Sequence, residues 1–339
     1  MRSVTHLKAD TLNLQPLEGY TLVKTVGVGT FGAVFLCNNA KGEPVAIKKV
    51  FMDPKFKSRE LQLVSRLQHP NNLVYIGHKF INEGQRQHKF LILITDYLPD
   101  SLPMFMSKFP FPPPLYVKLW GYQMFSGLAY LHAHSIAHRD IKPSNVLVDP
   151  DDGRLQLCDF GSAKFLLPGE KSVSYIATRN YRAPELLLDC PAYTFSIDVW
   201  SAGCVLAELF LQGRSLFNGR NNSELLTSIV KTIGSPNPED LESFESSKRF
   251  TQFGIKGMTL KAALPSFTPP EFIDLLEKIF IFNVKKRYTA VDCMRHPFFA
   301  DLFNPGTTLP SGKPLPDYLY KMKTPEEMFR NFPNGPSPE

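Results

Sequence analysis

Residues 138–145 read HRDIKPSN, and this stretch decides how the rest of the chain is interpreted. Asp140 is a carboxylate that can accept the proton of a hydroxyl group, and the amide oxygen of Asn145 can hold a metal ion. A second stretch, DFG at residues 159–161, follows an apolar run at residues 155–158 that is expected to be a strand. Asp159 would be a further oxygen ligand for Mg²⁺. Together the two stretches predict a site where Mg²⁺ bridges phosphates beside a hydroxyl acceptor.

A glycine-rich stretch earlier in the chain, GVGTFGAV at residues 27–34, has the pattern G-x-G-x-x-G-x-V. Glycines let backbone N–H groups approach a phosphate closely. A strand rather than a helix is expected after it, which argues against a dinucleotide site and favours a strand–loop–strand lid. Lys48 ends the apolar run VAIK at residues 45–48, and Glu60, on an expected helix at residues 58–67, could pair with it. Taken singly, these features are also compatible with a flexible hairpin and surface charges.

These stretches, with APE at residues 183–185, occur in the order and at the spacings of the protein-kinase signature set. The chain therefore resembles the eukaryotic protein kinases over residues 20–300, and Lys142 marks the serine/threonine type. The resemblance implies an α+β fold, the bilobal protein kinase fold. A small antiparallel β-sheet N-lobe with one helix would span residues 20–98, and a larger, mainly helical C-lobe residues 99–300.

The resemblance also implies roles for individual residues. ATP and Mg²⁺ are the implied cofactors, with ATP between the lobes. Asp140 would orient the acceptor hydroxyl and accept its proton. Asp198 would brace the catalytic loop, and Glu185 would pair with Arg287. The implied catalytic residues are Lys48, Glu60, Asp140, Lys142, Asn145 and Asp159, of which Asn145 and Asp159 are the metal ligands. The implied nucleotide-binding residues are Gly27, Val28, Gly29, Phe31, Gly32, Val34, Ala46, Lys48, Thr95 as gatekeeper, Asp96, Tyr97, Leu98, Leu147 and Cys158.

Several stretches are similar to one family of kinases in particular, glycogen synthase kinase-3. They are VAIKKV at residues 45–50, FKSREL at 56–61, CDFGSAK at 158–164, VSYI at 173–176 and the run from 193 to 209. The resemblance implies a serine/threonine protein kinase of this type.

A pocket for a phosphate follows from this resemblance. In the kinase fold three basic residues would converge near the activation segment: Arg59, Arg139 and Lys164. Clustered like charges call for an anion. Related kinases supply a phosphothreonine from their own chain, but the corresponding residue here is Val173. The resemblance therefore implies substrates whose target Ser or Thr lies four residues before a residue that is already phosphorylated. Ser172 and Ser174 flank Val173, so filling of the pocket by the chain itself stays open.

Tyr175 matches the activation-loop tyrosine that the family autophosphorylates, and a phosphate there would pair with Arg179 or Arg182. Two other interpretations remain. A kinase of the cyclin-dependent or mitogen-activated group would need a phosphorylatable residue at Val173 or a Thr-x-Tyr pair ending at Tyr175, and neither is present. A pseudokinase scaffold would need a missing lysine or aspartate in the motifs, and none is missing.

The composition of the chain limits which partners and which cellular compartment we expect. The chain has 339 residues, is 43% hydrophobic and carries a net charge of +6, which is too dilute to suggest nucleic-acid or membrane partners. Its 5 cysteines form no CxxC pair, so we expect a reducing compartment: the cytoplasm, with the nucleus left open. The expected partners are ATP and protein substrates, above all primed phosphoproteins. Scaffold proteins stay open because residues 243–264 match the family's docking region poorly.

Periodicity gives the remaining expectations. Val117 to Leu131 should form a helix with one side packed inward, residues 197–211 a helix buried all round, and residues 272–282 an amphipathic helix. Residues 90–95 should form a buried strand. Residues 1–19 would be an N-terminal extension. Residues 301–339 would be a proline-rich C-terminal tail, extended over the surface or loose.

Overall fold

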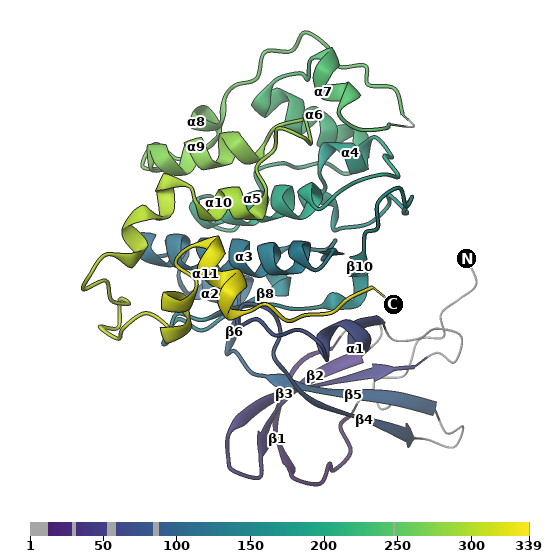
Figure 1. Ribbon diagram of the computed structural model, residues 1–339, viewed down its shortest axis with the longest axis vertical. Coiled ribbons are helices and arrows are strands. Elements are labelled where there is room, and N and C mark those ends of the chain that lie inside the picture. Colours follow the sequence, from purple (N-terminus) through teal and green to yellow (C-terminus); the bar gives the residue numbers. More distant parts are fainter. Residues whose placement is uncertain (1–12, 29–31, 53–58, 84–87, 247, 339) are drawn as a thin grey trace. The chain divides into compact units, whose positions relative to one another are not determined.

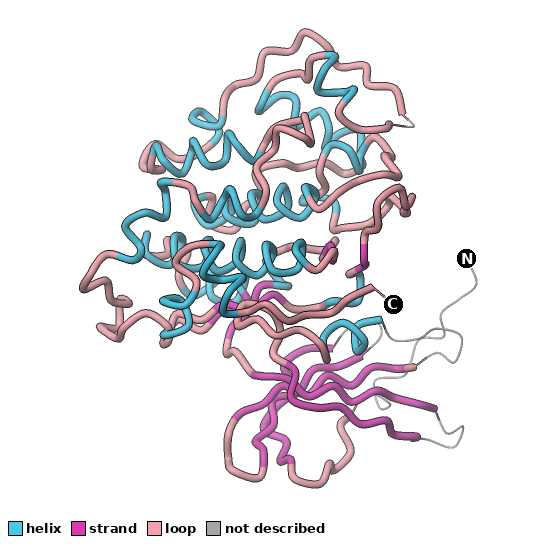
Figure 2. Tube along the Cα trace, viewed as in Figure 1, coloured by secondary structure: helices cyan, strands magenta, loops and turns pink. Residues whose placement is uncertain are grey.

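The structure is a computed structural model that describes residues 13–28, 32–52, 59–83, 88–246 and 248–338, with only the backbone described at position 59. Contacts divide the chain into two compact units. Unit 1 comprises Met1–Gln68 and Leu73–Tyr97, and unit 2 comprises His69–Asn72 and Leu98–Glu339. Strands dominate unit 1 and helices dominate unit 2 (Figures 1 and 2). The α+β fold class predicted from the sequence is confirmed.

Unit 1 is built on a five-stranded antiparallel sheet with the strand order β1-β2-β3-β5-β4. Alternate apolar side chains of β2 and β3 pack with those of β5 into the core of the unit, and β5 is buried from Phe90 to Ile94, as its apolar run predicts. The strands are β1 (Tyr20–Val28), β2 (Gly32–Asn39), β3 (Pro44–Phe51), β4 (Tyr75–Glu83) and β5 (His88–Asp96).

The glycine-rich stretch lies at the hairpin between β1 and β2. Gly27 pairs with Val34 and Val28 with Ala33 in the antiparallel ladder, so a strand follows the loop, as predicted. Gly32 stands against the next strand. A Cβ there would lie 2.3 Å from the backbone oxygen of Lys49, a distance that no side chain tolerates. This glycine is therefore required by the sheet itself.

The helix of unit 1, α1 (Arg59–Val64), is shorter than the predicted span of 58–67. The chain turns after it and enters His69–Asn72, a segment that belongs to unit 2. There the Asn71 side-chain amide donates to Gln123 at 2.8 Å and to the Leu155 carbonyl at 3.0 Å. The helix ends early because the residues after it are anchored elsewhere.

Unit 2 contains two small sheets that carry the loops of the candidate site. The three-stranded sheet has the order β6-β8-β9, and β7 pairs with β10 in the second sheet. Their bounds are β6 (Asp100–Ser101), β7 (Ile136–Ala137), β8 (Val146–Val148), β9 (Leu155–Leu157) and β10 (Lys164–Phe165). Residues 138–145 thus connect β7 to β8.

Helices form the rest of unit 2. The α-helices are α2 (Leu102–Lys108), α3 (Pro114–Ala133), α4 (Pro184–Leu187), α5 (Ser196–Phe210), α6 (Asn222–Ile233), α7 (Pro238–Glu242), α8 (Leu260–Ala263), α9 (Pro270–Ile279), α10 (Ala290–Met294) and α11 (Pro325–Asn331). The 3₁₀ helices are η2 (Pro143–Asn145), η3 (Phe160–Ser162), η4 (Arg179–Tyr181), η5 (Pro297–Phe303) and η6 (Asp317–Lys321). The helices predicted around residues 197–211 and 272–282 correspond to α5 and α9.

The prediction that only one side of the 117–131 helix packs inward is wrong. Between Tyr116 and Leu131 every residue of α3 except Lys118 is buried. Neighbours far apart in the sequence surround the helix: α5, α10, α11, η5 and β9. A helix at the centre of a unit is covered on all sides, which its own periodicity does not reveal.

The C-terminal tail is folded onto α3 rather than extended throughout. The Tyr122 hydroxyl donates to the Met322 carbonyl at 2.6 Å and the Tyr130 hydroxyl to the Asn334 carbonyl at 2.6 Å. A capping box at Thr324 begins α11, and the side chain of Met328 is fully buried. Figure 1 shows this yellow segment running beside α3.

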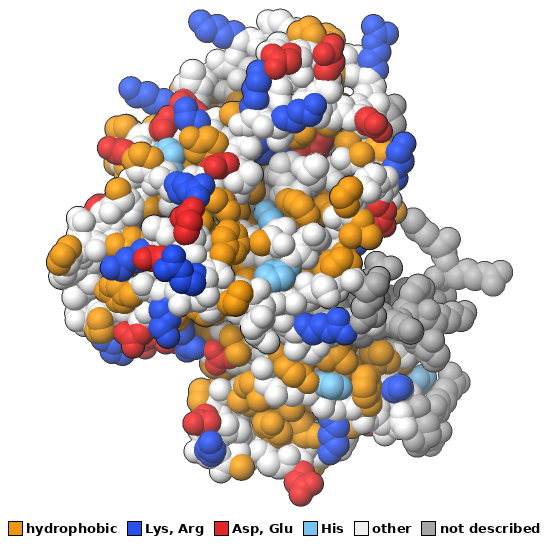
Figure 3. All heavy atoms as spheres, in the orientation of Figure 1, with side chains coloured by type: hydrophobic (Ala, Val, Ile, Leu, Met, Phe, Trp, Pro, Cys, Tyr) orange, Lys and Arg blue, Asp and Glu red, His pale blue; other side chains and the backbone are white. Residues whose placement is uncertain are grey.

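The surface drawn in Figure 3 shows acidic and basic side chains interspersed over unit 2, as expected for a dilute excess charge. Among the described residues, no helix has both the length and the hydropathy needed to cross a bilayer.

Candidate active site

The loop at residues 138–145 is fixed by a buried carboxylate of α5. Asp198 is 1% exposed and accepts the backbone N–H groups of His138 and Arg139, each at 2.8 Å. Arg139 has a φ of 67°, in the left-handed region that a non-glycine residue adopts only at a cost. Burial raises the pKa of Asp198, but hydrogen bonding to His132 and nearby charge outweigh it, so the pKa is lowered. The predicted bracing of the loop is present.

Three residues donate hydrogen bonds to the Asp140 carboxylate, and one of them is Asn145, whose Nδ2 donates to Oδ2 at 3.3 Å. Oδ2 of Asp140 also accepts from Lys142 Nζ at 2.7 Å, and its Oδ1 accepts from the hydroxyl and backbone N–H of Thr178 at 2.8 and 3.0 Å. Burial raises the pKa of Asp140, but the hydrogen bonds from Lys142 and Thr178 outweigh burial and leave the pKa below its ordinary value. The group is therefore an ionised carboxylate at neutral pH, held in one orientation.

Asn145 and Asp159 are brought together by the backbone. The Cys158 N–H donates to the Asn145 carbonyl at 3.0 Å, which places Asp159 beside Asn145. The Asn145 amide nitrogen donates to the Asp140 carbonyl at 2.8 Å, so its side-chain oxygen, the hard donor, is directed away from that bond. In the described residues no group of three or more His, Cys, Asp or Glu is placed to hold a metal. Mg²⁺ prefers oxygen ligands and is usually held by one or two protein groups together with phosphate oxygens and water. The side-chain oxygens of Asn145 and Asp159 fit this preference.

The predicted pair of Lys48 and Glu60 forms within unit 1. Lys48 Nζ lies 2.7 and 2.9 Å from the two oxygens of Glu60, which links β3 to α1. Glu60 is 8% exposed, whereas the Lys48 side chain is 29% exposed. The pair therefore holds the ammonium against α1, while the lysine side chain stays partly exposed.

The predicted nucleotide-binding residues are distributed over both units. In unit 1, Ala46 and the buried Thr95 face each other across the β3–β5 ladder. In unit 2, Leu98 is buried and Leu147 pairs with Gln156 in the β8–β9 ladder. Four further residues of unit 1 lie at the β1–β2 hairpin: Gly27, Val28, Gly32 and Val34. Asp96 ends β5 and Tyr97 follows it, both in unit 1. In unit 2, Cys158 follows β9. Gly29 and Phe31 lie outside the described residues.

The APE stretch contributes a buried ion pair. Glu185 and Arg287 are both fully buried and are joined by two hydrogen bonds of 2.7 and 3.0 Å. The guanidinium also donates to the carbonyls of Ile281 and Ser196. This predicted pair is present, and it ties the end of the activation segment to the loop before α10.

Two of the three predicted phosphate-binding residues can be followed in unit 2. Lys164 Nζ lies 2.6 Å from Glu170 Oε1 and donates to Ser172 Oγ at 2.8 Å. The hydrogen bond from Lys164, and to a lesser degree the charge of Arg139, lower the pKa of Glu170. Lys164 and Arg139 thus both act on Glu170, a residue to which the sequence motifs give no role. The side chain of Arg59 lies outside what the structure describes.

Tyr175 is 68% exposed on the activation segment. The guanidinium of Arg182 lies 4.3 Å from the ring centroid. Hydrogen bonding and charge from Arg182, followed by the charge of Arg179, lower the pKa of the Tyr175 hydroxyl. Both arginines expected beside this tyrosine therefore act on it.

One acidic residue near the catalytic loop escapes sequence reasoning. Glu208 lines a cavity of about 300 Å³ together with Lys142 and Thr178. Its Oε2 accepts from the Tyr181 hydroxyl at 3.3 Å, and among the described residues its buried Oε1 has no hydrogen-bond partner. Burial raises the pKa of Glu208 to about 7. Only its place on the all-buried helix α5, among apolar residues, could have drawn attention to it.

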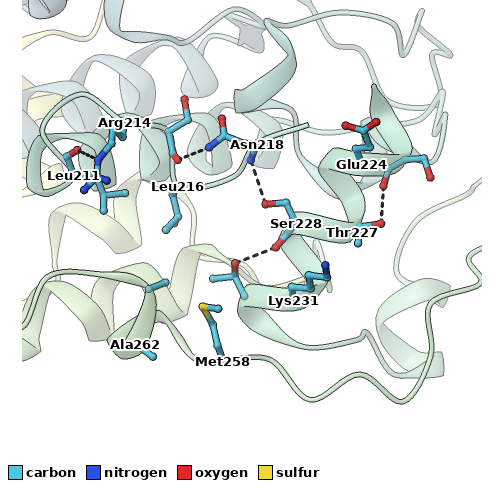
Figure 4. A pocket seen from close by; sticks show the side chains of 14 residues that line it. Leu211, Arg214, Leu216, Asn218, Glu224, Thr227, Ser228, Lys231, Met258 and Ala262 are labelled. Atoms are coloured by element: carbon cyan, nitrogen blue, oxygen red, sulfur yellow. Dashed lines mark hydrogen bonds between the residues drawn. The ribbon is translucent and has the colours of Figure 1, made fainter. Parts of the chain in front are cut away.

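A separate pocket of about 820 Å³ lies between α6 and the segments around Ser215 and Met258 (Figure 4). Asn180 of the activation segment donates to Ser215 at 3.3 Å and to Asn218 at 3.1 Å at its edge. In Figure 4 the Asn218 N–H donates to Ser228 of α6. Asn180 thus joins the activation segment to this wall.

Comparison with known proteins agrees with the fold and the site geometry. A model of the protein kinase domain matches residues 20–299. The chain therefore belongs to the protein kinase family and is an ATP-dependent protein serine/threonine kinase. Within that family it resembles glycogen synthase kinase 3: the protein of that name from Trypanosoma brucei brucei (strain 927/4 GUTat10.1) is 41% identical over 333 residues, 94% of this chain and 94% of the relative. ATP and Mg²⁺ are the cofactors of the family.

Proposed function

We propose that this kinase phosphorylates Ser or Thr in proteins that already carry a phosphate four residues C-terminal to the target. The observation that carries the proposal is the anion held by the activation segment: Glu170 is bound by Lys164 and lies in the field of Arg139. Val173, at the position where related kinases carry a phosphothreonine, is 71% exposed and has no hydroxyl group. A phosphate carries more charge and more acceptors than a carboxylate, so a primed substrate would compete for these cations.

The chemical step is assigned to residues of both units. Asp140, ionised and held by Lys142 and Thr178, would orient the acceptor hydroxyl and take its proton. Lys142 would stabilise negative charge on the transferring group, and the Lys48–Glu60 pair would hold phosphate oxygens. Asn145 and Asp159 would hold Mg²⁺. The bound nucleotide and metal supply the phosphoryl group and neutralise its charge.

Regulation and setting are part of the same proposal. Phosphorylation of Tyr175 would place a dianion beside Arg182 and Arg179 and order the activation segment. None of the five cysteines forms a disulfide, which suits a reducing cytoplasm or nucleus. Primed phosphoproteins are the proposed partners. Scaffold proteins remain a prediction that residues 243–264 do not strengthen, and neither nucleic acid nor membrane is proposed as a partner.

The test uses one peptide made with and without phosphoserine at the +4 position. We expect kcat/KM to be about tenfold or more higher for the primed peptide, since a phosphate gains one or more charge-assisted hydrogen bonds. Lys164→Ala should remove most of this preference while the unprimed rate is kept. Lys171→Ala is the matched control, because Lys171 is an exposed lysine of the same segment whose carboxylate partner, Glu245, is also exposed.

Equal rates for the two peptides with the unchanged protein would refute the priming proposal. That outcome would favour the alternative interpretation, a kinase of the cyclin-dependent or mitogen-activated group, which needs no primed substrate.

A further inference from the structure

The activation segment places a serine hydroxyl on the cation that is proposed to bind the priming phosphate. Lys164 Nζ donates to Ser172 Oγ at 2.8 Å while it pairs with Glu170 at 2.6 Å. The Lys164 side chain is 24% exposed, so part of its surface is already covered by these two partners. Ser172 is thus already within contact distance of the proposed pocket.

The backbone explains why Ser172, and not Val173, is directed at the cation. The Ser172 N–H donates to the Pro191 carbonyl at 2.8 Å, which fixes this residue against the segment after α4. Ser172 is half-buried, whereas Val173 is 71% exposed. The chain position that would face the pocket in related kinases therefore faces solvent here, and its neighbour takes the contact.

Charge decides what a phosphate on Ser172 would do. A phosphoserine carries about −1.5 to −2 charges at pH 7 and has three acceptor oxygens, against one charge and two oxygens for Glu170. It would be attached to the atom that already touches Lys164, so little chain entropy is lost in reaching the pocket. The Glu170 side chain is 39% exposed and can be displaced at small cost, because exposed ion pairs are weak.

We propose that Ser172 is a regulatory phosphorylation site and that its phosphate occupies the pocket of Lys164 and Arg139, in place of the phosphate of a primed substrate. In the modifying step the Ser172 Oγ attacks the γ-phosphorus of ATP in the active site of a protein kinase. The new O–P bond forms as the bond to ADP breaks, and the hydroxyl proton passes to that kinase's catalytic carboxylate. ADP is released, and the activation segment keeps the phosphate.

The modification would change substrate choice rather than abolish activity. A filled pocket excludes the +4 phosphate of a primed substrate, whereas substrates without a phosphate do not use the pocket. This inference rests on the proposed priming pocket and adds a mechanism by which the chain itself fills that pocket.

The experiment compares three forms of the full chain: unmodified, with phosphoserine incorporated at position 172, and with phosphoserine incorporated at position 174. The third form is the matched control, because it adds the same charge two residues further along the same segment. The primed and unprimed peptides are assayed with each form. We expect the primed-to-unprimed ratio of kcat/KM to fall about tenfold or more at position 172 and to change much less at position 174.

A second readout does not depend on activity. The ³¹P NMR titration of the phosphate at position 172 should give a lower second pKa than that at position 174, and Lys164→Ala should remove the difference. A primed preference in the unmodified protein that persists unchanged with phosphate at position 172, or ³¹P titrations that do not differ, would overturn this inference and leave the priming proposal standing. Equal rates for both peptides with the unmodified protein would overturn the priming proposal itself.

Discussion

Unit 2 contains two sets of charges that differ in burial and in purpose. In the first, Asp198 and the pair of Glu185 and Arg287 are buried, and their bonds hold backbone groups, the side chains of His132 and Ser196, and each other. In the second, Lys164 and Glu170 are partly exposed and are joined by a single contact. Buried charges are expensive to leave unpaired, whereas exposed pairs exchange partners at small cost. The first set is suited to fixing geometry and the second to exchanging one anion for another.

Arg139 belongs to both sets. Its backbone N–H is held by buried Asp198, and its guanidinium donates to the Ser162 carbonyl at 2.6 Å and to the Tyr193 hydroxyl at 2.9 Å. The strained φ of 67° is thus maintained by the buried set, and the charge of Arg139 contributes to lowering the pKa of Glu170 in the exposed set. The neighbouring residue, Asp140, is the proposed catalytic carboxylate. The buried set of Asp198, Glu185 and Arg287 is therefore a buried frame for the residues to which we assign catalysis and substrate selection.

The largest expected effect is on the carboxylate that the frame positions. Asp140→Asn keeps the size of the side chain but removes the proton acceptor, so phosphate transfer from radiolabelled ATP should fall about 10³- to 10⁴-fold. Asp152→Asn is the matched control, because Asp152 is a half-exposed carboxylate bound to Arg154 in the same unit. Comparable activity of the two variants would remove Asp140 from the catalytic step.

The next largest effect is on the stability that the buried frame contributes. Arg287→Ala leaves Glu185 fully buried without its cation, so the free energy of unfolding should fall by about 3–5 kcal/mol in urea denaturation. Lys286→Ala is the adjacent control: Lys286 pairs with Glu239 at 2.6 Å, but both side chains are more than half exposed. Its loss should be about 0–1 kcal/mol. If both variants lost the same stability, burial would not be what separates the two sets of charges.

A smaller effect concerns Glu208, a buried carboxylate outside this frame. Glu208 has a pKa raised by burial from 4.5 to about 7. Its stabilising contribution is complete below pH about 4.5 and is lost as pH rises through about 7, because the unfolded state releases this proton first. Glu208→Gln should therefore flatten the pH dependence of unfolding in this window by about 3 kcal/mol. Glu239→Gln, at an exposed position, should leave the slope unchanged; the same slope for Glu208→Gln and the unchanged protein would contradict the prediction.

The sequence predicts the chemistry of this site better than its surroundings. Asp140, Asn145 and Asp159 lie in short motifs whose spacing is set by local chain geometry, and the partners of Lys48 and Glu185 follow from the family resemblance. Two other contacts depend on how loops fold in space: Glu170 with Lys164, and Thr178 with Asp140. The local sequence pattern does not predict them. No local pattern predicts strand β4, since its residues show no alternation between a buried and an exposed face.

The prediction that α3 packs on one side only is wrong for a similar reason: its contacts are not encoded in the local sequence. Its apolar spacing suggests one buried side, but the coverage of the other side comes from α11 and the C-terminal tail, about two hundred residues away. Burial by segments remote in sequence is a property of the tertiary structure alone. In contrast, α5 was identified correctly because it is apolar nearly all round.

The smallest effect tests whether the exposed set is open to exchange. Glu170→Gln removes the carboxylate that occupies Lys164, so a primed peptide no longer has to displace it. We expect KM for the primed peptide to fall about two- to fivefold, with kcat and the unprimed rate unchanged, since exposed pairs are weak. The gain should shrink in high salt, which screens both interactions. Glu245→Gln, which removes the exposed partner of Lys171, is the matched control and should not change KM. A rise in KM for the primed peptide with Glu170→Gln would mean that Glu170 helps to build the pocket rather than fill it, and the exposed set would then be part of the frame.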